Sequence, residues 1–208
     1  MNIFFTFFIF SIVLFFYLHI HYQMKISNDL EVYTIERPTK DKLEEICDLR
    51  QPVIFDYHNQ ELIEKCNLSN LEEQYGAFDI KLRNINEDND DTKQMYLPFL
   101  FKEAVELFQN GKNKYYITEK NKDFLKETGT IKLFKYNDAF LRPHFVSNCL
   151  YDFCSGSVSC RTPLRYNLNY RNYFYLTSGK INIKLIPPSS AKYLNTIKDY
   201  ENFEFRSD

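Results

Sequence analysis

The sequence lacks the excess of basic residues that nucleic-acid-binding proteins use. Lys and Arg total 26 against 28 Asp and Glu, which gives the 208-residue chain a formal net charge of -2. Affinity for nucleic acids depends on clusters of Lys and Arg that neutralise phosphates. We therefore expect no nucleic-acid partner for this chain.

Glycine and tryptophan are also scarce, and internal repeats are absent. The chain has five Gly and no Trp beside 20 Phe and 16 Tyr. With its many Asn, Ile and Lys residues, this composition indicates an A/T-rich coding sequence, as in large DNA viruses or A/T-rich microbes. The length suffices for one domain with an appendage and excludes two full domains with separate cores.

A long apolar run opens the chain. Residues 3–20 contain no charged side chain and only three polar interruptions. A helix needs about 20 mostly apolar residues to span a bilayer core of about 30 Å. We predict a transmembrane anchor over residues 1–22 and a polar linker over residues 23–38.

A cleaved signal peptide and a buried core helix are the two alternatives for this run. A signal peptide normally has basic residues before the apolar stretch and small residues at its cleavage site. Met1 and Asn2 have no charged side chain, and the sequence His19–Gln23 contains no small residue. These features favour an uncleaved, single-pass anchor.

The distribution of basic residues predicts the side of the membrane. Lys25, Arg37 and Lys40 follow the apolar run and none precedes it, so the positive-inside rule places the polar part in the cytoplasm. Asn67 begins a formal N-glycosylation acceptor, Asn-Leu-Ser. A glycan there would show the opposite topology.

The polar part of the chain has helical patterns first and strand patterns later, which favours an α+β fold. The expected helices begin at Thr39, include Leu62–Cys66, run from a Ser69–Glu72 capping box to Gly76, span Leu97–Gly111, and cover Asn121–Thr128. The expected strands are Gln51–Phe55, Ala77–Ile85, Tyr115–Thr118, Ile131–Phe134, Tyr173–Thr177 and Ile181–Ile186. The last two strands flank Ser178-Gly179 and stop at a proline pair, so they predict a β-hairpin.

Several short motifs in this part of the chain together indicate a resemblance to a known protein family. They are Arg50-Gln-Pro-Val-Ile-Phe55, Phe140-Leu-Arg-Pro143, Thr162-Pro-Leu-Arg-Tyr166, Tyr170-Arg-Asn172, Thr177-Ser-Gly179, Lys184-Leu-Ile-Pro-Pro188 and Asp199-Tyr-Glu-Asn-Phe-Glu-Phe205. With them the chain resembles the cupin-like, Jumonji C-type family of double-stranded β-helix proteins, most closely those of giant viruses. The resemblance implies a helical and mixed part over residues 39–130 and an incomplete jelly-roll barrel over residues 131–208.

Active members of that family are Fe(II)- and 2-oxoglutarate-dependent dioxygenases, whose iron requires two imidazoles and a carboxylate. The resemblance aligns Asn167 and Asn169 with the family's His and acid pair, and Ile181 with its cosubstrate-binding Lys. Amide oxygens are neutral, weak ligands. We therefore expect no catalytic metal and no cofactor, and we interpret the chain as a non-catalytic binding or scaffold module.

Two alternatives stay open. The first is an active iron and 2-oxoglutarate-dependent protein hydroxylase that takes ligands from a partner chain, from a missing segment, or from Asn167, Asn169 and His144. The second is a truncated gene product without a stable fold. An open barrel leaves unpaired strand edges, which predicts a protein partner or self-association through them.

Other side chains are weaker candidates for a site. Arg165, Tyr166, Tyr173 and Lys184 are possible pocket residues. Arg142, Arg165 and Arg171 are expected to form structural ion pairs, with Asp152 and Asp199 as candidate partners. Cys149, Cys154 and Cys160 lie too far apart for zinc knuckles and are expected as packed thiols, or as a disulfide if the domain is lumenal.

Overall fold

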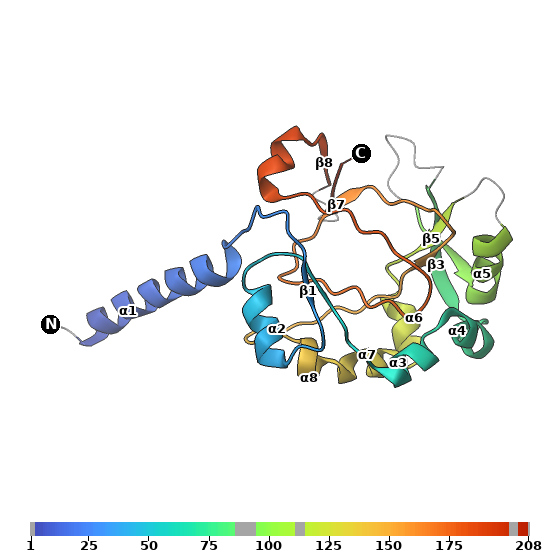
Figure 1. Ribbon diagram of the computed structural model, residues 1–208, viewed down its shortest axis with the longest axis horizontal. Helices are drawn as coiled ribbons and strands as arrows, with labels where there is room; N and C mark the ends of the chain where they lie inside the picture. Colours follow the sequence, from blue (N-terminus) through green and yellow to red (C-terminus); the bar gives the residue numbers. More distant parts are fainter. Residues whose placement is uncertain (1–2, 86–94, 111–114, 200–203, 208) are drawn as a thin grey trace. The chain divides into compact units, whose positions relative to one another are not determined.

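The computed structural model describes residues 3–85, 95–110, 115–199 and 204–207 (Figure 1). These residues form a mixture of helices and small sheets, so the expected α+β class is confirmed. The chain forms two compact units. Unit 1 comprises Met1–Tyr57, Arg165–Phe174 and Asn182–Asp208, and unit 2 comprises His58–Leu164 and Tyr175–Ile181.

Unit 1 contains the amino-terminal helix and two small sheets. Its helices are α1 (Ile3–Leu18), the π-helical turn η1 (His19–Gln23), α2 (Lys40–Cys47) and the 3-10 helix η3 (Pro188–Tyr193). Its strands are β1 (Tyr33–Ile35), β2 (Val53–Phe55), β7 (Leu164–Tyr166), β8 (Thr196–Asp199) and β9 (Glu204–Ser207). Strands β1 and β2 pair in parallel, and the second sheet has the order β7-β9-β8.

Helix α2 begins where the sequence predicts. The Thr39 hydroxyl accepts a hydrogen bond from the Lys42 N–H at 3.4 Å and caps the first turn. One turn later, Leu43 is fully buried. The cap and the single apolar stripe explain why this short, polar segment is helical.

Unit 2 is built on a four-stranded antiparallel sheet of order β4-β3-β5-β6. Its strands are β3 (Asp79–Asn84), β4 (Leu97–Leu100), β5 (Tyr116–Thr118) and β6 (Ser155–Gly156). Its helices are α3 (Gln60–Lys65), α4 (Leu68–Tyr75), α5 (Phe101–Asn110), α6 (Lys122–Glu127), α7 (Ile131–Tyr136) and α8 (Asp138–Leu141).

The core of unit 2 lies between this sheet and α5, which packs beside β3 and β5 (Figure 1). Ile80 and Leu82 alternate along β3 with polar residues and point to the core. Phe101 is fully buried, and its ring lies 5.3 Å from that of Phe124 and 5.8 Å from that of Phe153 between centroids. These aromatic contacts hold segments from three parts of the sequence together.

The predicted helix Leu97–Gly111 is wrong in its first four residues. Leu97–Leu100 forms strand β4, in which Pro98 lies opposite Lys81 of β3. Because β4 is at the edge of the sheet, the missing N–H of proline leaves no ladder bond unmade. The helix starts only at Phe101, with the rest of the prediction correct as far as Asn110.

The predicted strand Ile131–Phe134 is also wrong, because these residues form helix α7. The β-branched and aromatic side chains favour a strand by propensity. However, Ile131 and Phe134 are spaced by three, and both pack on the core of unit 2. The stabilisation gained by burying that helical face outweighs the strand propensity of the individual residues.

Helix α4 begins two residues earlier than expected. Asn67 is its N-cap, since the Asn67 side-chain oxygen accepts a hydrogen bond from the Asn70 N–H at 2.9 Å. The predicted capping box at Ser69 is therefore wrong, whereas the predicted end at Gly76 is confirmed.

The predicted β-hairpin is not formed as a ladder. Residues 167–187 contain no strand, although Gly179 adopts the positive φ of 82° that a turn requires. The alternation persists in the side chains, because every second residue from 171 to 177 is partly buried and those between are exposed. Within unit 2, side chains tether this segment: Thr177 Oγ1 donates to the Cys66 carbonyl at 2.9 Å.

A jelly-roll barrel is not confirmed by these sheets. The described strands form sheets of two, four and three strands. The predicted boundaries at residues 39 and 131 stay predictions, because the two units interleave along the sequence.

Candidate functional site

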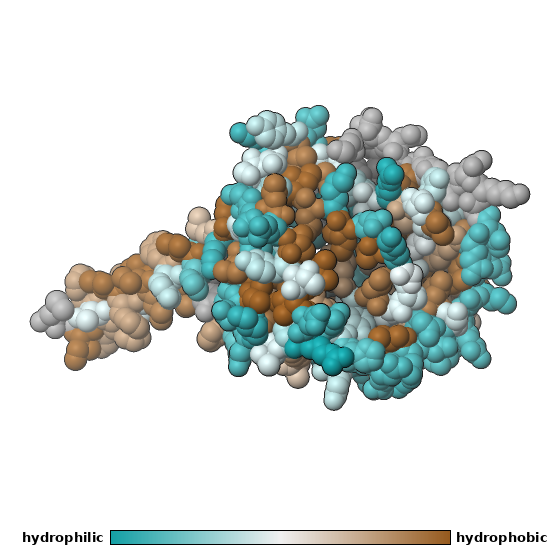
Figure 2. All heavy atoms as spheres, in the orientation of Figure 1, coloured by the Kyte–Doolittle hydropathy of each residue, from teal (hydrophilic) through white to brown (hydrophobic). Residues whose placement is uncertain are grey.

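The most distinctive surface of the protein is helix α1 with its continuation into η1. Residues Ile3–His21 form a helical stretch of 19 residues with a mean hydropathy of 2.4, and none of it is buried. At about 1.5 Å per residue, this stretch approaches the thickness of a bilayer core, about 30 Å. Apolar side chains cover its length in Figure 2. It is long and apolar enough to cross a membrane.

Aromatic pairs mark the carboxyl end of this helix. The rings of Phe15 and His19 stack with centroids 5.9 Å apart, and those of Tyr17 and His21 stack at 5.8 Å. Amphipathic rings of this kind are typical of the membrane–water interface. The end of the stretch thus has the chemistry of an interfacial belt.

Unit 1 contains a largely buried ionic cluster, which we call the Arg171 cluster. Arg171 donates through Nη1 to Glu44 Oε1 at 2.8 Å and through Nη2 to Asp48 Oδ1 at 3.0 Å. The side chains of Arg171 and Glu44 are 9% and 14% exposed, and that of Asp48 is 42% exposed. Glu44 and Asp48 are four residues apart, so both face the same side of α2. The cluster therefore joins residues 165–174 to α2.

A second cationic contact reinforces this junction. The Arg50 guanidinium lies over the Tyr170 ring, 4.1 Å from its centroid, and Nη1 donates to the Tyr170 carbonyl at 3.4 Å. Arg171 itself lies 5.4 Å from the same ring centroid. Two guanidinium groups thus share one aromatic ring.

The electrostatics of the Arg171 cluster suit a structural role. Burial raises the pKa of the Cys47 thiol, and the positive charge of Arg171 only partly opposes this effect. Burial also raises the pKa of Tyr173 to about 12. Both groups are therefore neutral at pH 7, and a protonated thiol is a poor nucleophile.

Unit 2 contains its own buried pair. Arg83 Nη2 lies 3.3 Å from Glu119 Oε1, and the Arg83 side chain is 1% exposed. The Tyr96 hydroxyl donates to the same Glu119 oxygen, and its ring lies 5.6 Å from the Arg83 guanidinium. Burial, followed by the Glu119 charge, raises the pKa of the nearby Cys160 thiol.

Among the described residues, Asp152 bonds to backbone N–H groups, whereas the sequence predicted an arginine partner. Its carboxylate accepts hydrogen bonds from the backbone N–H groups of Asn121 at 2.6 Å and Lys120 at 2.8 Å. Arg142 instead donates to the carbonyls of Val146 and Ser147. The expectation of structural ion pairing is confirmed for Arg171, but with Glu44 and Asp48 as partners.

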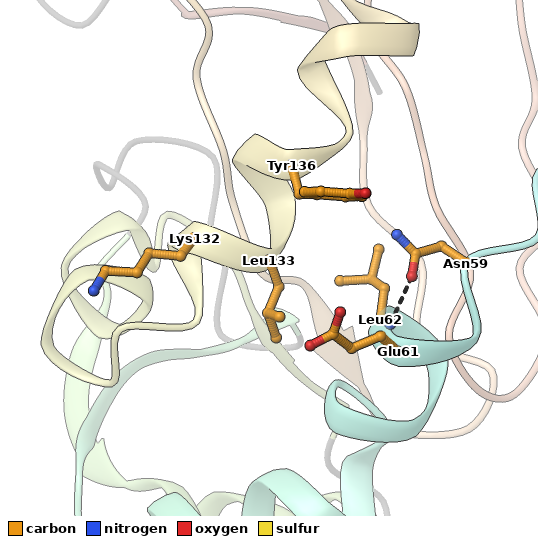
Figure 3. Close-up of a pocket in the computed structure, with 6 residues that line it drawn as sticks. All are labelled: Asn59, Glu61, Leu62, Lys132, Leu133 and Tyr136. Atoms are coloured by element: carbon orange, nitrogen blue, oxygen red, sulfur yellow. Dashed lines mark hydrogen bonds between the residues drawn. The ribbon is translucent and has the colours of Figure 1, made fainter.

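A small hollow of about 190 Å³ lies between α3 and α7 (Figure 3). Its lining consists of Asn59, Glu61, Leu62, Lys132, Leu133 and Tyr136. The Asn59 side chain is used to cap α3, and Glu61 pairs with Lys65 at 2.7 Å. In Figure 3, Lys132 points away from the other side chains, so the polar groups do not converge on one ligand position.

The residues aligned with the family's iron and cosubstrate ligands lie on the surface. Asn167, Asn169 and Ile181 are exposed, and the Asn169 amide donates to the Asn172 side chain at 3.0 Å. His144 is exposed as well. Among the residues that the structure describes, no three His, Cys, Asp or Glu side chains form a group that could hold a metal ion.

The four possible pocket residues have different surroundings. Tyr173 belongs to the Arg171 cluster, and Arg165 is partly buried. Tyr166 and Lys184 are exposed. The five cysteines, all within the described residues, form no disulfide with one another, and Cys154 is exposed.

Sequence reasoning missed the part that Glu44 and Asp48 play. Their spacing of four on one helix face is a readable signal for a shared partner. Arg171 lies 127 residues from Glu44, so no local pattern connects them.

Comparisons with protein-family models, with curated proteins and with solved structures find no match for this chain.

Proposed function

We propose that this protein is a single-pass membrane protein whose polar part is a non-catalytic binding or scaffold module. The observation that supports the anchor is that no residue of the apolar stretch Ile3–His21 is buried. A helix that is apolar on every side and has no protein surface against it is stable in a lipid bilayer, where its backbone bonds are satisfied internally. In water, the same surface would drive aggregation.

The proposal of a non-catalytic module is supported by the state of the reactive groups. The thiols of Cys47, Cys66 and Cys160 have raised pKa values because they are buried. Asn167 and Asn169 present exposed amides rather than an imidazole and a carboxylate. A distant relation to cupin-like proteins and a cytoplasmic position for the polar part belong to the same proposal.

The surface that we propose for a protein partner lies in residues 182–186 of unit 1. Ile183 and Leu185 are 50% and 62% exposed. No backbone hydrogen bond joins these five residues to another described backbone group. An exposed segment whose backbone groups are not used in a sheet, and whose side chains are apolar, is suited to pairing with a strand of a partner.

Alkaline extraction of membranes tests the anchor. The full chain should stay in the membrane pellet, whereas a Phe10→Lys and Val13→Lys double variant should move to the supernatant. Each Lys at the centre of a spanning helix costs about 2.5–3.5 kcal/mol in insertion measurements. A Thr6→Val and Ser11→Val variant is the matched control and should remain in the pellet. Release of the unaltered chain by alkali would contradict the proposal.

A further inference from the structure

The segment that follows the helix has an alternating pattern. Its apolar side chains are Met24, Ile26, Leu30 and Val32, with exposed fractions of 63, 64, 78 and 51%. The positions between them are Lys25, Ser27, Asp29 and Glu31. Four large apolar side chains thus lie on the surface within nine residues.

The segment has no regular secondary structure, and its polar side chains form local hydrogen bonds. It contains no helix or strand, Met24 has αR dihedral angles, and its large apolar side chains are exposed. Local bonds hold it: Ser27 Oγ accepts from the Asp29 N–H at 3.2 Å, and Asp29 Oδ1 accepts from the Glu31 N–H at 3.0 Å. The polar residues bond among themselves and leave the apolar set open.

Asn28 interrupts the series of apolar residues at the even-numbered positions. It is the polar member of the even-numbered set, and its side-chain oxygen accepts a hydrogen bond from the Ser189 N–H at 2.8 Å. Asn28 thus ties the segment to η3 within unit 1.

The segment directly follows the apolar helix in the chain. It is continuous with the apolar helix, since the Met24 N–H still bonds to the His19 carbonyl at 3.2 Å. A residue adds at most about 3.6 Å of chain length, so Val32 lies within about 40 Å of the helix end along the chain. The nearest extensive apolar phase is the bilayer that the helix enters.

We propose that Met24, Ile26, Leu30 and Val32 insert into the interfacial layer of the membrane that α1 spans, and that Met24–Val32 is a lipid-contact segment. This inference rests on the proposed membrane anchor. Asp29 and Glu31 outnumber Lys25 in the segment, so it binds through apolar contact and does not depend on anionic lipids.

The absence of tryptophan makes the test clean, because one introduced Trp is the only indole in the chain. The full chain is reconstituted in phosphatidylcholine vesicles containing nitroxide-labelled lipid, with the nitroxide either near the headgroup or deep in the acyl chains. Leu30→Trp reports on the segment and Glu31→Trp is its matched control. Phe10→Trp reports on the helix.

The inference predicts a blue-shifted emission for Leu30→Trp, quenching by the shallow nitroxide, and protection from iodide in water. Glu31→Trp should emit at longer wavelength and be quenched by iodide. Phe10→Trp should be quenched by the deep nitroxide.

Three outcomes would overturn the inference, and they are distinguishable. If Phe10→Trp is quenched by lipid and Leu30→Trp is as open to iodide as Glu31→Trp, the lipid contact is wrong and the anchor stands. If Leu30→Trp is shielded from both quenchers, protein or a second copy covers the segment instead. If Phe10→Trp itself escapes the lipid quencher, the proposed anchor fails and the inference fails with it.

Discussion

Arg171 and Glu44 form a hydrogen-bonded ion pair at 2.8 Å although 127 positions separate them in the sequence. Both side chains are largely buried. The pair holds residues 167–174, which form no strand, against α2 within unit 1. Charge pairing thus replaces backbone pairing at this position.

Replacing Arg171 with Met should destabilise the protein by about 3–5 kcal/mol, because Glu44 then keeps a buried charge without a partner. The double variant Arg171→Met with Glu44→Gln should recover part of that loss. Urea unfolding followed by near-ultraviolet circular dichroism measures both. Lys42→Met, in the exposed pair with Glu45, is the control and should change stability by less than about 1 kcal/mol. An equal loss in the single and double variants would contradict the role of the ion pair.

Phe101→Ala should destabilise unit 2 by about 3–5 kcal/mol, because it removes a fully buried ring from the contact with Phe124 and Phe153. Phe174 is 65% exposed, so Phe174→Ala should change stability by no more than about 0.5 kcal/mol. Thermal unfolding of the two variants side by side checks the contrast. Equal midpoints would show that the described core is wrong.

Asn67→Ala should cost about 1 kcal/mol, because it removes the N-cap of α4. Asn67→Asp should retain most of the stability, since a carboxylate also accepts from the Asn70 N–H.

The Asn67 amide nitrogen, to which a glycan would attach, donates to the Glu64 carbonyl at 2.9 Å, so glycosylation would compete with that hydrogen bond. A shift in mobility on deglycosylation of the cellular protein would place the domain in the lumen and refute the predicted cytoplasmic side.

Stability should fall as the pH rises above about 9. Burial raises the pKa of Cys66 from 9.0 to about 11, so between these values the folded state holds a proton that the unfolded state has lost. The folded state is then disfavoured progressively through that window, with no effect below it. Urea midpoints at a series of pH values measure the decline. Cys66→Ala should show a shallower slope, and an unchanged slope would contradict the assignment.

Where one segment determines its own structure, the sequence is sufficient. Thr39 caps α2 through its own side chain, and Gly76 ends α4. The apolar composition of residues 3–20 likewise specifies a helix that is apolar all round. In these cases the signal and the structure involve the same few residues.

Where contacts with residues far away in the sequence determine the secondary structure, local sequence patterns predict it wrongly. Leu97–Leu100 is a strand because β3 pairs with it, and Ile131–Tyr136 is a helix because the core takes one of its faces. Residues 173–177 keep an alternating burial pattern without a ladder, since periodicity reports on side chains and not on backbone pairing. The Arg171 cluster could not be predicted for the same reason.

The central claim is that residues 3–21 stay in the protein as a membrane anchor. Intact-mass analysis of the chain from alkali-washed membranes tests it most directly. The account predicts a membrane-bound species whose mass includes the apolar helix. A soluble species that lacks the first twenty or so residues, as a signal peptidase would leave, would contradict it.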